Sequence, residues 1–414
     1  MSAPSKKTKL PDGVRGRSPN SAGDGALTPK RQRRELGLRP RISLLGALLL
    51  FPAAVLAAPY ADPKLVDLWS NMDEHHAARG VQRPVAAREL KRAAPDAALD
   101  KLLDQFLDKH PNTGLLVLKG DTILAERYQY GRTAGHRMAS ASVAKTVLAM
   151  LVGIAIQERK ITSLDHQAGY YVPRMRGQPY ADVTIRELLT MSSGIMSRDE
   201  LDGREEGLKL MRNTLGRETG GGLDVLKDFD WRVAPSGTKF RYASADSEAL
   251  GFVLITATHT PLAEYLSEKI WKPMGAEAHA TWLTDKAGHE MGYCCINATL
   301  RDYARFGMLL ANYGALDGKQ IIPAEWVKAA TTPSADYLKV GVATPNNGYG
   351  YQTWITHKSE PRFAALGVHG QGIFVDPVTK LVVVHTAVWA DPNDRAERGA
   401  QFRLFEAIHK LESR

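Results

Sequence analysis

The chain has 414 residues, 44% of them hydrophobic, and a formal net charge of +9. This is ample for a large hydrophobic core in one big domain or two closely packed subdomains. Eleven basic and three acidic residues lie in 1–58, so this stretch carries +8 and the remainder is nearly neutral. With no basic stripe of interleaved aromatic residues and no zinc-ligand spacing of Cys and His, the sequence argues against nucleic-acid binding and against a metal site.

The first 95 residues divide into three parts. Residues 1–41 are polar, basic and rich in Pro, Gly and Ser, which predicts a disordered basic leader. Residues 42–58 form an uncharged apolar run with an Ala-rich end, which predicts a signal peptide or, alternatively, an uncleaved membrane anchor. The protein would then be exported, periplasmic or anchored in the inner membrane. Residues 59–95 are mixed and charged, and we expect an N-terminal arm.

The folded part is expected over 96–414 and begins with short local elements. Apolar residues at helical spacing predict a helix over 96–110. Residues 114–128 predict a β-hairpin that turns at 119–121. A second apolar helical pattern then begins at Ser142.

Helices dominate the middle of the chain and strands its end. Residues 183–194 start with a Thr cap and a capping-box Glu and end at Gly, whereas 195–232 are polar and glycine-rich and predict a long irregular excursion. The later pattern predicts helices at 249–257, 262–271, 299–310 and 323–330, strands at 348–354, 363–375 and 381–389, and a final amphipathic helix around 402–411. This order indicates an α+β protein with a helical insertion at about 173–300.

A serine and a lysine stand one helical turn apart where the pattern at 142–154 begins. Ser142 would lie in the first turn, and Lys145 falls on the same face. A serine hydroxyl needs a neighbouring base to become a nucleophile, and a lysine can serve if its neutral form is accessible. The free N–H groups of the helix N-terminus suit a developing oxyanion. An isolated S-x-x-K is more often a solvated helix face, so the motif needs further support.

Two later stretches supply that support. Tyr242 and Ser244 follow a Pro-Ser-Gly turn, and a phenol near an ammonium can lose its proton below its usual pKa of about 10 and relay protons. The alternative is a buried tyrosine that anchors a loop. Residues 366–372 form a glycine-spaced strand, which lets a ligand or another backbone approach closely. The alternative there is a bulge or tight packing.

In this order the three elements resemble the serine β-lactamase and penicillin-binding protein superfamily, in its class C-like branch of esterases and amidases. The segments at 183–194 and 297–307 strengthen the resemblance, which runs from about residue 96 to the C-terminus. The greatest similarity is to 6-aminohexanoate-dimer hydrolase-type enzymes, which share a V/I-H-G-Q segment followed by an apolar strand and Asp-Pro. The resemblance implies a β-lactamase/transpeptidase-like fold, with an antiparallel sheet flanked by helices and a mainly helical second subdomain.

The resemblance also implies roles for particular residues. Ser142 would be the acylated nucleophile, Lys145 its activating partner and Tyr242 the proton relay. The oxyanion hole would combine the backbone N–H of Ser142 with that of Val368. His369 would lie near the site, as a donor that faces the substrate.

Two departures from the family pattern bear on the substrate. Ser244 stands at a substrate-binding position where the family often has Asn, and no Lys-Thr-Gly is present. In the family that lysine helps to hold a substrate carboxylate in β-lactamases and peptidoglycan peptidases. Its absence favours ester or linear-amide hydrolysis over β-lactam hydrolysis. Specificity would lie in the loops at 195–232 and 331–347.

The sequence therefore predicts a serine hydrolase that cleaves a small ester or amide through a covalent acyl-enzyme, with no metal or organic cofactor. The first alternative is a penicillin-binding carboxypeptidase or β-lactamase. The second is a non-catalytic envelope binding protein of the same fold.

Cys294 and Cys295 are adjacent, and we expect two small buried thiols, since a disulfide between neighbours strains the peptide.

Overall fold

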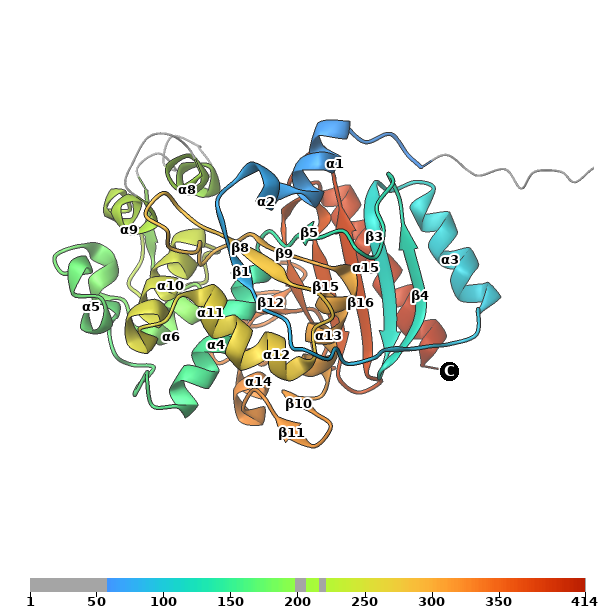
Figure 1. Cartoon of the computed structure of the whole chain (residues 1–414). Helices are drawn as coiled ribbons and strands as arrows, with labels where there is room; N and C mark the ends of the chain where they lie inside the picture. Colours follow the sequence, from blue (N-terminus) through green and yellow to red (C-terminus); the bar gives the residue numbers. More distant parts are fainter. Residues whose placement is uncertain (1–57, 198–205, 216–220, 414) are drawn as a thin grey trace, which may run out of the picture. The chain divides into compact units, whose positions relative to one another are not determined.

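The computed structural model describes residues 58–197, 206–215 and 221–413, shown as the coloured ribbon in Figure 1. The basic leader predicted for 1–41 lies outside these residues, as does all of 42–58 except Ala58, so the disorder and the export signal stay predictions. Within the described ranges, no helix is both long and apolar enough to cross a membrane.

The largest sheet has eight strands in the order β12-β13-β14-β15-β16-β3-β4-β2. Neighbours pair antiparallel, except that β2 runs parallel to β4. The strands are β2 (Lys91–Arg92), β3 (Asn112–Lys119), β4 (Thr122–Tyr128), β12 (Gly348–Tyr349), β13 (Trp354–Ile355), β14 (Phe363–Leu366), β15 (Gly372–Asp376) and β16 (Leu381–Ala387). The hairpin predicted for 114–128 is confirmed as β3 and β4.

Both faces of this sheet are buried, which explains why its central strands are almost wholly apolar. On β3, Leu116 and Leu118 point into the main core, whereas Leu115 and Val117 point into a second cluster on the opposite face. Helix α13 (Leu300–Ala311) covers the first face, and α3 (Ala97–Leu107) and α15 (Arg395–Glu412) cover the second. Helices on both faces of a mainly antiparallel sheet confirm the predicted α+β class.

A second sheet has four strands in the order β1-β8-β9-β5. Its strands are β1 (Ala78–Val81), β8 (Ala280–Leu283), β9 (Ile296–Ala298) and β5 (Met138–Ala139). The predicted arm at 59–95 therefore contributes strands to both sheets and also holds α1 (Pro63–Ser70) and α2 (Met72–His75).

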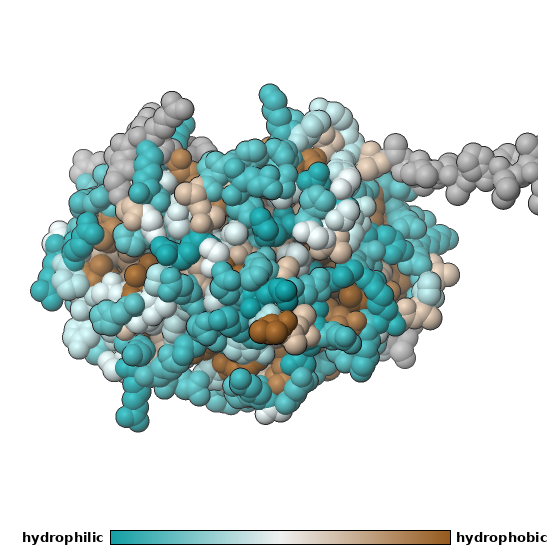
Figure 2. All heavy atoms as spheres, in the orientation of Figure 1, coloured by the Kyte–Doolittle hydropathy of each residue, from teal (hydrophilic) through white to brown (hydrophobic). Residues whose placement is uncertain are grey.

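The remaining elements are mostly helical. They lie just before and within the region predicted as an insertion, and in the segment after α13. They are α5 (Ala168–Tyr171), α6 (Ile185–Leu189), α8 (Glu206–Thr214), α9 (Gly222–Val225), α10 (Ser244–Thr258), α11 (Leu262–Leu266), α12 (Lys272–Met274) and α14 (Ala324–Ala330), with the small strand pairs β6 (Ile195–Met196) with β7 (Trp231–Arg232) and β10 (Ala315–Leu316) with β11 (Lys319–Gln320). The face seen in Figure 2 is mostly hydrophilic, with scattered apolar residues.

Four predicted elements were wrong in detail. The expected strand at 363–375 is two antiparallel strands, because His369 and Gly370 adopt positive φ of 55° and 90° and reverse the chain. The expected strand at 348–354 is likewise two short strands, β12 and β13. The excursion at 195–232 holds helices α8 and α9 among its described residues, and the helix predicted at 249–257 begins earlier, at Ser244.

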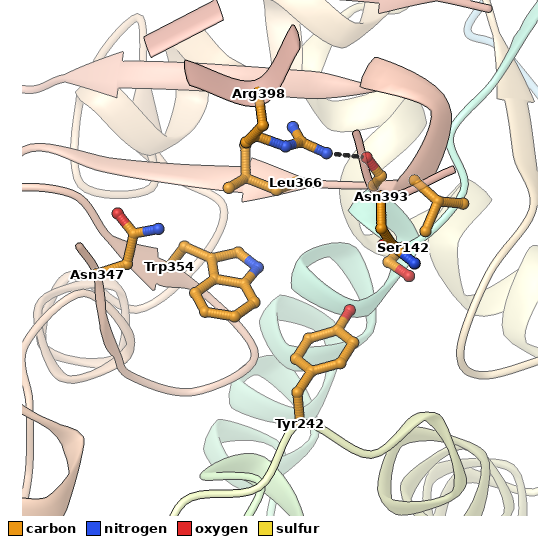
Figure 3. Close-up of a pocket in the computed structure, with 9 residues that line it drawn as sticks. Ser142, Tyr242, Asn347, Trp354, Leu366, Asn393 and Arg398 are labelled. Carbon is orange, nitrogen blue, oxygen red and sulfur yellow. Dashed lines mark hydrogen bonds between the residues drawn. The ribbon is translucent and has the colours of Figure 1, made fainter. Parts of the chain in front are cut away.

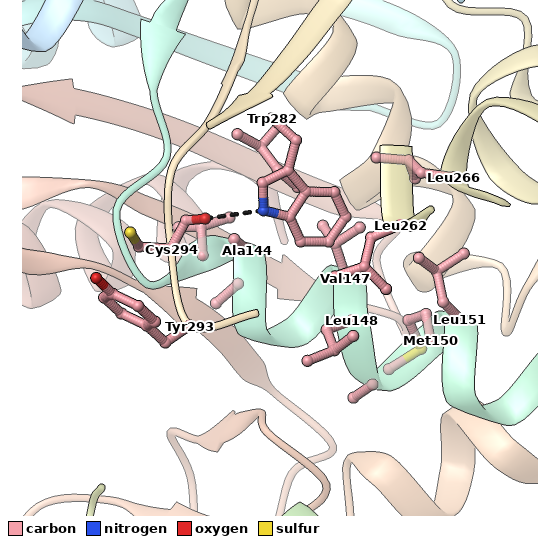
Figure 4. Packing of buried hydrophobic residues seen from close by; sticks show 14 of the residues in the cluster. Ala144, Val147, Leu148, Met150, Leu151, Leu262, Leu266, Trp282, Tyr293 and Cys294 are labelled. Carbon is pink, nitrogen blue, oxygen red and sulfur yellow. Dashed lines mark hydrogen bonds between the residues drawn. The ribbon is translucent and has the colours of Figure 1, made fainter. Parts of the chain in front are cut away.

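Helix α4 (Val143–Gln157) runs through the main core and is buried on nearly every side (Figure 4). Leu262 and Leu266 of α11 and Trp282 of β8 pack beside it. On another side, Gly153 admits the Trp326 ring so closely that a Cβ at this position would lie 2.2 Å from it. Packing all round fixes the position of the first turn of this helix, where the candidate site begins.

Candidate active site

Ser142 is the N-cap residue of α4, and the second sheet sets its position. Strands β5 and β9 pair antiparallel, so the turn after β5 meets the segment before β9. The backbone N–H of Ser140 donates to Ile296 (2.7 Å), and that of Cys295 donates to the carbonyl of Ala141 (3.3 Å). Ala141 has φ of 45°, a conformation that non-glycine residues rarely adopt, immediately before Ser142.

Lys145 lies one turn further along α4 and its side chain is only 1% exposed. Its Nζ donates to Ser142 Oγ at 2.9 Å and to the backbone carbonyl of Tyr293 at 2.7 Å. The same Nζ lies 5.2 Å from the centre of the Tyr242 ring. The amine is thus held in a dry environment beside the serine hydroxyl, which is the arrangement that activation of a serine requires.

Tyr242 approaches from a different part of the chain, two residues before α10 begins. Its ring stacks on Trp354, with centroids 5.3 Å apart, and meets Tyr349 edge-on. In Figure 3 the phenol oxygen of Tyr242 points toward Ser142. The structure therefore brings Ser142, Lys145 and Tyr242 together, although the lysine and the tyrosine lie 97 positions apart in the sequence.

The turn after β14 provides a second backbone N–H next to the serine. A Cβ on Gly367 would lie 2.8 Å from both Ala141 Cβ and the Ser140 carbonyl, so only glycine permits this close approach. The N–H of Gly367 already donates to Gln371 (2.9 Å). Among the described residues, neither the N–H of Ser142 nor that of Val368 has a hydrogen-bond acceptor, and both residues line the same cavity. These two groups are therefore available to an oxyanion.

His369 and Ser244 do not line this cavity. The ring of His369 packs against Trp69, its Nδ1 lies 2.6 Å from the Trp389 carbonyl, and burial lowers its pKa. Ser244 is the first residue of α10 and is 8% exposed. Their predicted roles at the substrate therefore stay predictions.

The cavity beside Ser142 has a volume of about 330 Å³ (Figure 3). It is lined by Ser142, Tyr242, Asn347, Trp354, Leu366, Gly367, Val368, Asn393 and Arg398. Asn347 ends one of the two loops expected to set specificity, whereas the described residues of 195–232 contribute nothing to this lining. The cavity is large enough for a small ester or amide.

The expectation of two free thiols was wrong, because Cys294 and Cys295 form a disulfide. The bonded pair lies in the segment that leads into β9, directly after Tyr293, whose carbonyl accepts from Lys145. Trp282 holds the same segment by donating its indole N–H to the Cys294 carbonyl at 2.9 Å (Figure 4). This loop therefore contacts the catalytic candidates through its backbone.

Among the described residues, no group of three metal-ligating side chains could hold a metal ion.

Glu248, which no sequence motif indicated, supports the same loop. It lies on α10, is 1% exposed, and its Oε2 accepts from the Gly292 N–H at 2.8 Å. Burial, followed by repulsion from Asp285, raises the pKa of Glu248 from 4.5 to about 8. No pattern in the sequence could have marked this residue, since its neighbours come from distant segments.

This raised pKa predicts a pH-dependent stability. Between pH 4.5 and about 8 the folded chain holds a proton on Glu248 that the unfolded chain has lost, so stability falls as pH rises through this window. The slope from this one group is at most about 1.4 kcal/mol per pH unit. Thermal unfolding of Glu248→Gln between pH 5 and 9 should show a flatter profile than the wild type. Glu325→Gln, at an exposed position, should match the wild type; parallel profiles for all three proteins would disprove the assignment.

Residues 99–407 match the Beta-lactamase family. The chain is 27% identical over 372 residues to the 6-aminohexanoate-dimer hydrolase of Paenarthrobacter ureafaciens, covering 84% of this chain and 94% of that protein.

Solved structures give the same result for the fold. A putative 6-aminohexanoate-dimer hydrolase from Bacillus anthracis superposes with a TM-score of 0.76 at 27% identity, covering 85% of this chain and 96% of that one. A penicillin-binding protein from Bacillus halodurans superposes with a TM-score of 0.59 at 16% identity, covering 76% and 99%. The second similarity concerns the fold alone.

Proposed function

The chain belongs to the beta-lactamase family, and from this premise we propose that it is a serine hydrolase that cleaves an ester or amide bond through a covalent acyl-enzyme on Ser142. The family match and the amidase-type relatives support a hydrolase. The observation that carries the proposal is the 2.9 Å contact between Ser142 Oγ and the buried Nζ of Lys145, with the Tyr242 phenol facing the same serine.

The proposed reaction starts with attack of Ser142 Oγ on the carbonyl carbon. Neutral Lys145 takes the hydroxyl proton, and the N–H groups of Ser142 and Val368 stabilise the negative oxygen of the tetrahedral intermediate. The bond to the leaving group then breaks, and the leaving oxygen or nitrogen receives a proton through Tyr242. Water attacks the acyl-enzyme in the second half, which releases the acid and restores the serine.

A substrate panel tests this proposal on the purified protein. We expect turnover of short-chain p-nitrophenyl esters and linear amide oligomers, and inhibition of that turnover by a fluorophosphonate. Nitrocefin should be a poor substrate, because the lysine of a Lys-Thr-Gly element is missing. Preferential nitrocefin hydrolysis would favour a β-lactamase instead, and no turnover together with no fluorophosphonate adduct would favour a binding protein.

The relay role of Tyr242 gives a sharper expectation. Tyr242→Phe keeps the ring that stacks on Trp354 and removes only the hydroxyl. We expect kcat to fall by about 10²-fold or more, as is typical when a general acid–base group is removed. Tyr349→Phe is the matched control, because it removes a hydroxyl from the same aromatic cluster without lining the cavity. Equal effects in steady-state assays of the two variants would rule out a relay by Tyr242.

A further inference from the structure

A second cavity adjoins the one beside Ser142. It has a volume of about 610 Å³ and shares Asn347, Asn393 and Arg398 with the first. It extends along α15 to Arg395 and Phe402. Because three residues line both spaces, the two cavities lie directly next to each other.

The lining of the two cavities carries positive charge and no negative charge. Arg395 and Arg398 line them, and no Asp or Glu does. Within the part of the chain that the structure describes, neither guanidinium forms an ion pair with a carboxylate. The neighbouring acids are engaged elsewhere, since Asp394 caps α15 and Glu397 lies 2.8 Å from His110.

Arg398 is held in place by neutral partners. It donates to the Gly367 carbonyl and to Gln401 Oε1, each at 2.5 Å, and its guanidinium lies 4.7 Å from the centre of the Trp389 ring. Figure 3 shows its side chain above Trp354 at the cavity. Burial lowers the pKa of Arg398 to about 10, so the group still carries its charge at neutral pH. A partly buried cation without an anion gains free energy when a carboxylate binds to it.

We propose that the two cavities form one extended site in which Arg398, assisted by Arg395, binds a carboxylate at the far end of the substrate. This rests on the proposed function and narrows its substrate class. The substrate is a linear ester or amide whose acyl part ends in a carboxylate. Its apolar middle lies along Trp354 and Leu366, and its reacting carbonyl lies at Ser142.

The first test compares two esters that differ only in charge, the p-nitrophenyl esters of 5-carboxypentanoic and 5-carbamoylpentanoic acid. The wild type should prefer the carboxylate ester in kcat/KM by at least about tenfold, as expected for one charge-assisted contact. Arg398→Gln should abolish the preference, and Arg395→Gln should reduce it. Lys410→Gln removes a positive charge from the same helix outside both cavities and should keep it.

The decisive quantity is the ratio of kcat/KM between the two esters. Arg398→Gln also loses the hydrogen bond to the Gly367 carbonyl, which slows hydrolysis of both esters. No preference in the wild type, or an unchanged preference in Arg398→Gln, would overturn the proposal while leaving hydrolysis at Ser142 intact. If neither ester is hydrolysed, the proposed function fails, and binding decides this inference independently. Ligand-observed NMR should then detect hexanoate but not hexanamide on the wild type. The hexanoate signal should be lost in Arg398→Gln, weakened in Arg395→Gln and kept in Lys410→Gln. Equal binding of hexanoate and hexanamide to the wild type would contradict the carboxylate site.

Discussion

Replacing Ser142 by alanine is expected to lower kcat for a p-nitrophenyl ester by about four to six orders of magnitude, the range seen when a nucleophile is removed from a serine hydrolase. The reason is that the hydroxyl at the N-cap of α4 has no substitute, since Lys145 lies behind it in the core. Steady-state rates and fluorophosphonate labelling measure the effect. Ser142 makes no capping hydrogen bond through its side chain, so the free energy of unfolding should change little.

Ser359→Ala, at an exposed position between β13 and β14 that lines neither cavity, is the control and should retain full activity. Turnover by Ser142→Ala at more than about one per cent of the wild-type rate would show that another group is the nucleophile, because residual catalysis from the oxyanion hole and binding alone is far smaller.

Replacing Lys145 by methionine is expected to lower kcat by about three to four orders of magnitude, at the upper end of what one general base contributes. Methionine fills the same buried space but cannot accept the proton of Ser142 or donate to the Tyr293 carbonyl. The rate of fluorophosphonate labelling should fall in parallel, because that reaction needs the same activated hydroxyl. The free energy of unfolding should change less than kcat does, since a well-packed apolar side chain replaces a buried polar one.

Lys160→Met is the matched control, because it makes the same substitution at an exposed site just past the end of α4. If Lys145→Met were labelled as fast as the wild type, the lysine would serve only to hold the Tyr293 loop. In that case Glu248→Gln, which acts on the same loop through Gly292, should reduce activity to a similar degree.

Local spacing was enough to predict much of the site. The turn between Ser142 and Lys145 follows from the periodicity of one helix, and the capping box at Thr184 and Glu187 was found as expected. The family resemblance that rested on these motifs is confirmed by the match over 99–407. Residues three or four positions apart in a helix can be predicted to share a face, because helix geometry fixes their relative direction.

Contacts between remote segments could not be predicted in this way. Sheet pairing and helix packing bring the Tyr293 carbonyl and the Arg398 guanidinium to the site. They also bring the Glu248 carboxyl to the loop that carries Tyr293. The strand at 363–375 was misjudged because positive φ at His369 and Gly370 turns the chain, and the glycine spacing alone did not distinguish a turn from a bulge. This turn separates β14 from β15 and leaves the Val368 N–H beside Ser142.

The central claim is that Ser142 becomes acylated during turnover. Acid-quenching the wild-type protein with p-nitrophenyl acetate within the first turnovers, followed by intact-mass analysis and peptide mapping, tests it most directly. We expect one acetyl group per chain on the peptide that contains Ser142, formed as fast as the first p-nitrophenol and lost when the ester is exhausted. Steady hydrolysis with no adduct, or a kinetically competent adduct on any other residue, would contradict the account.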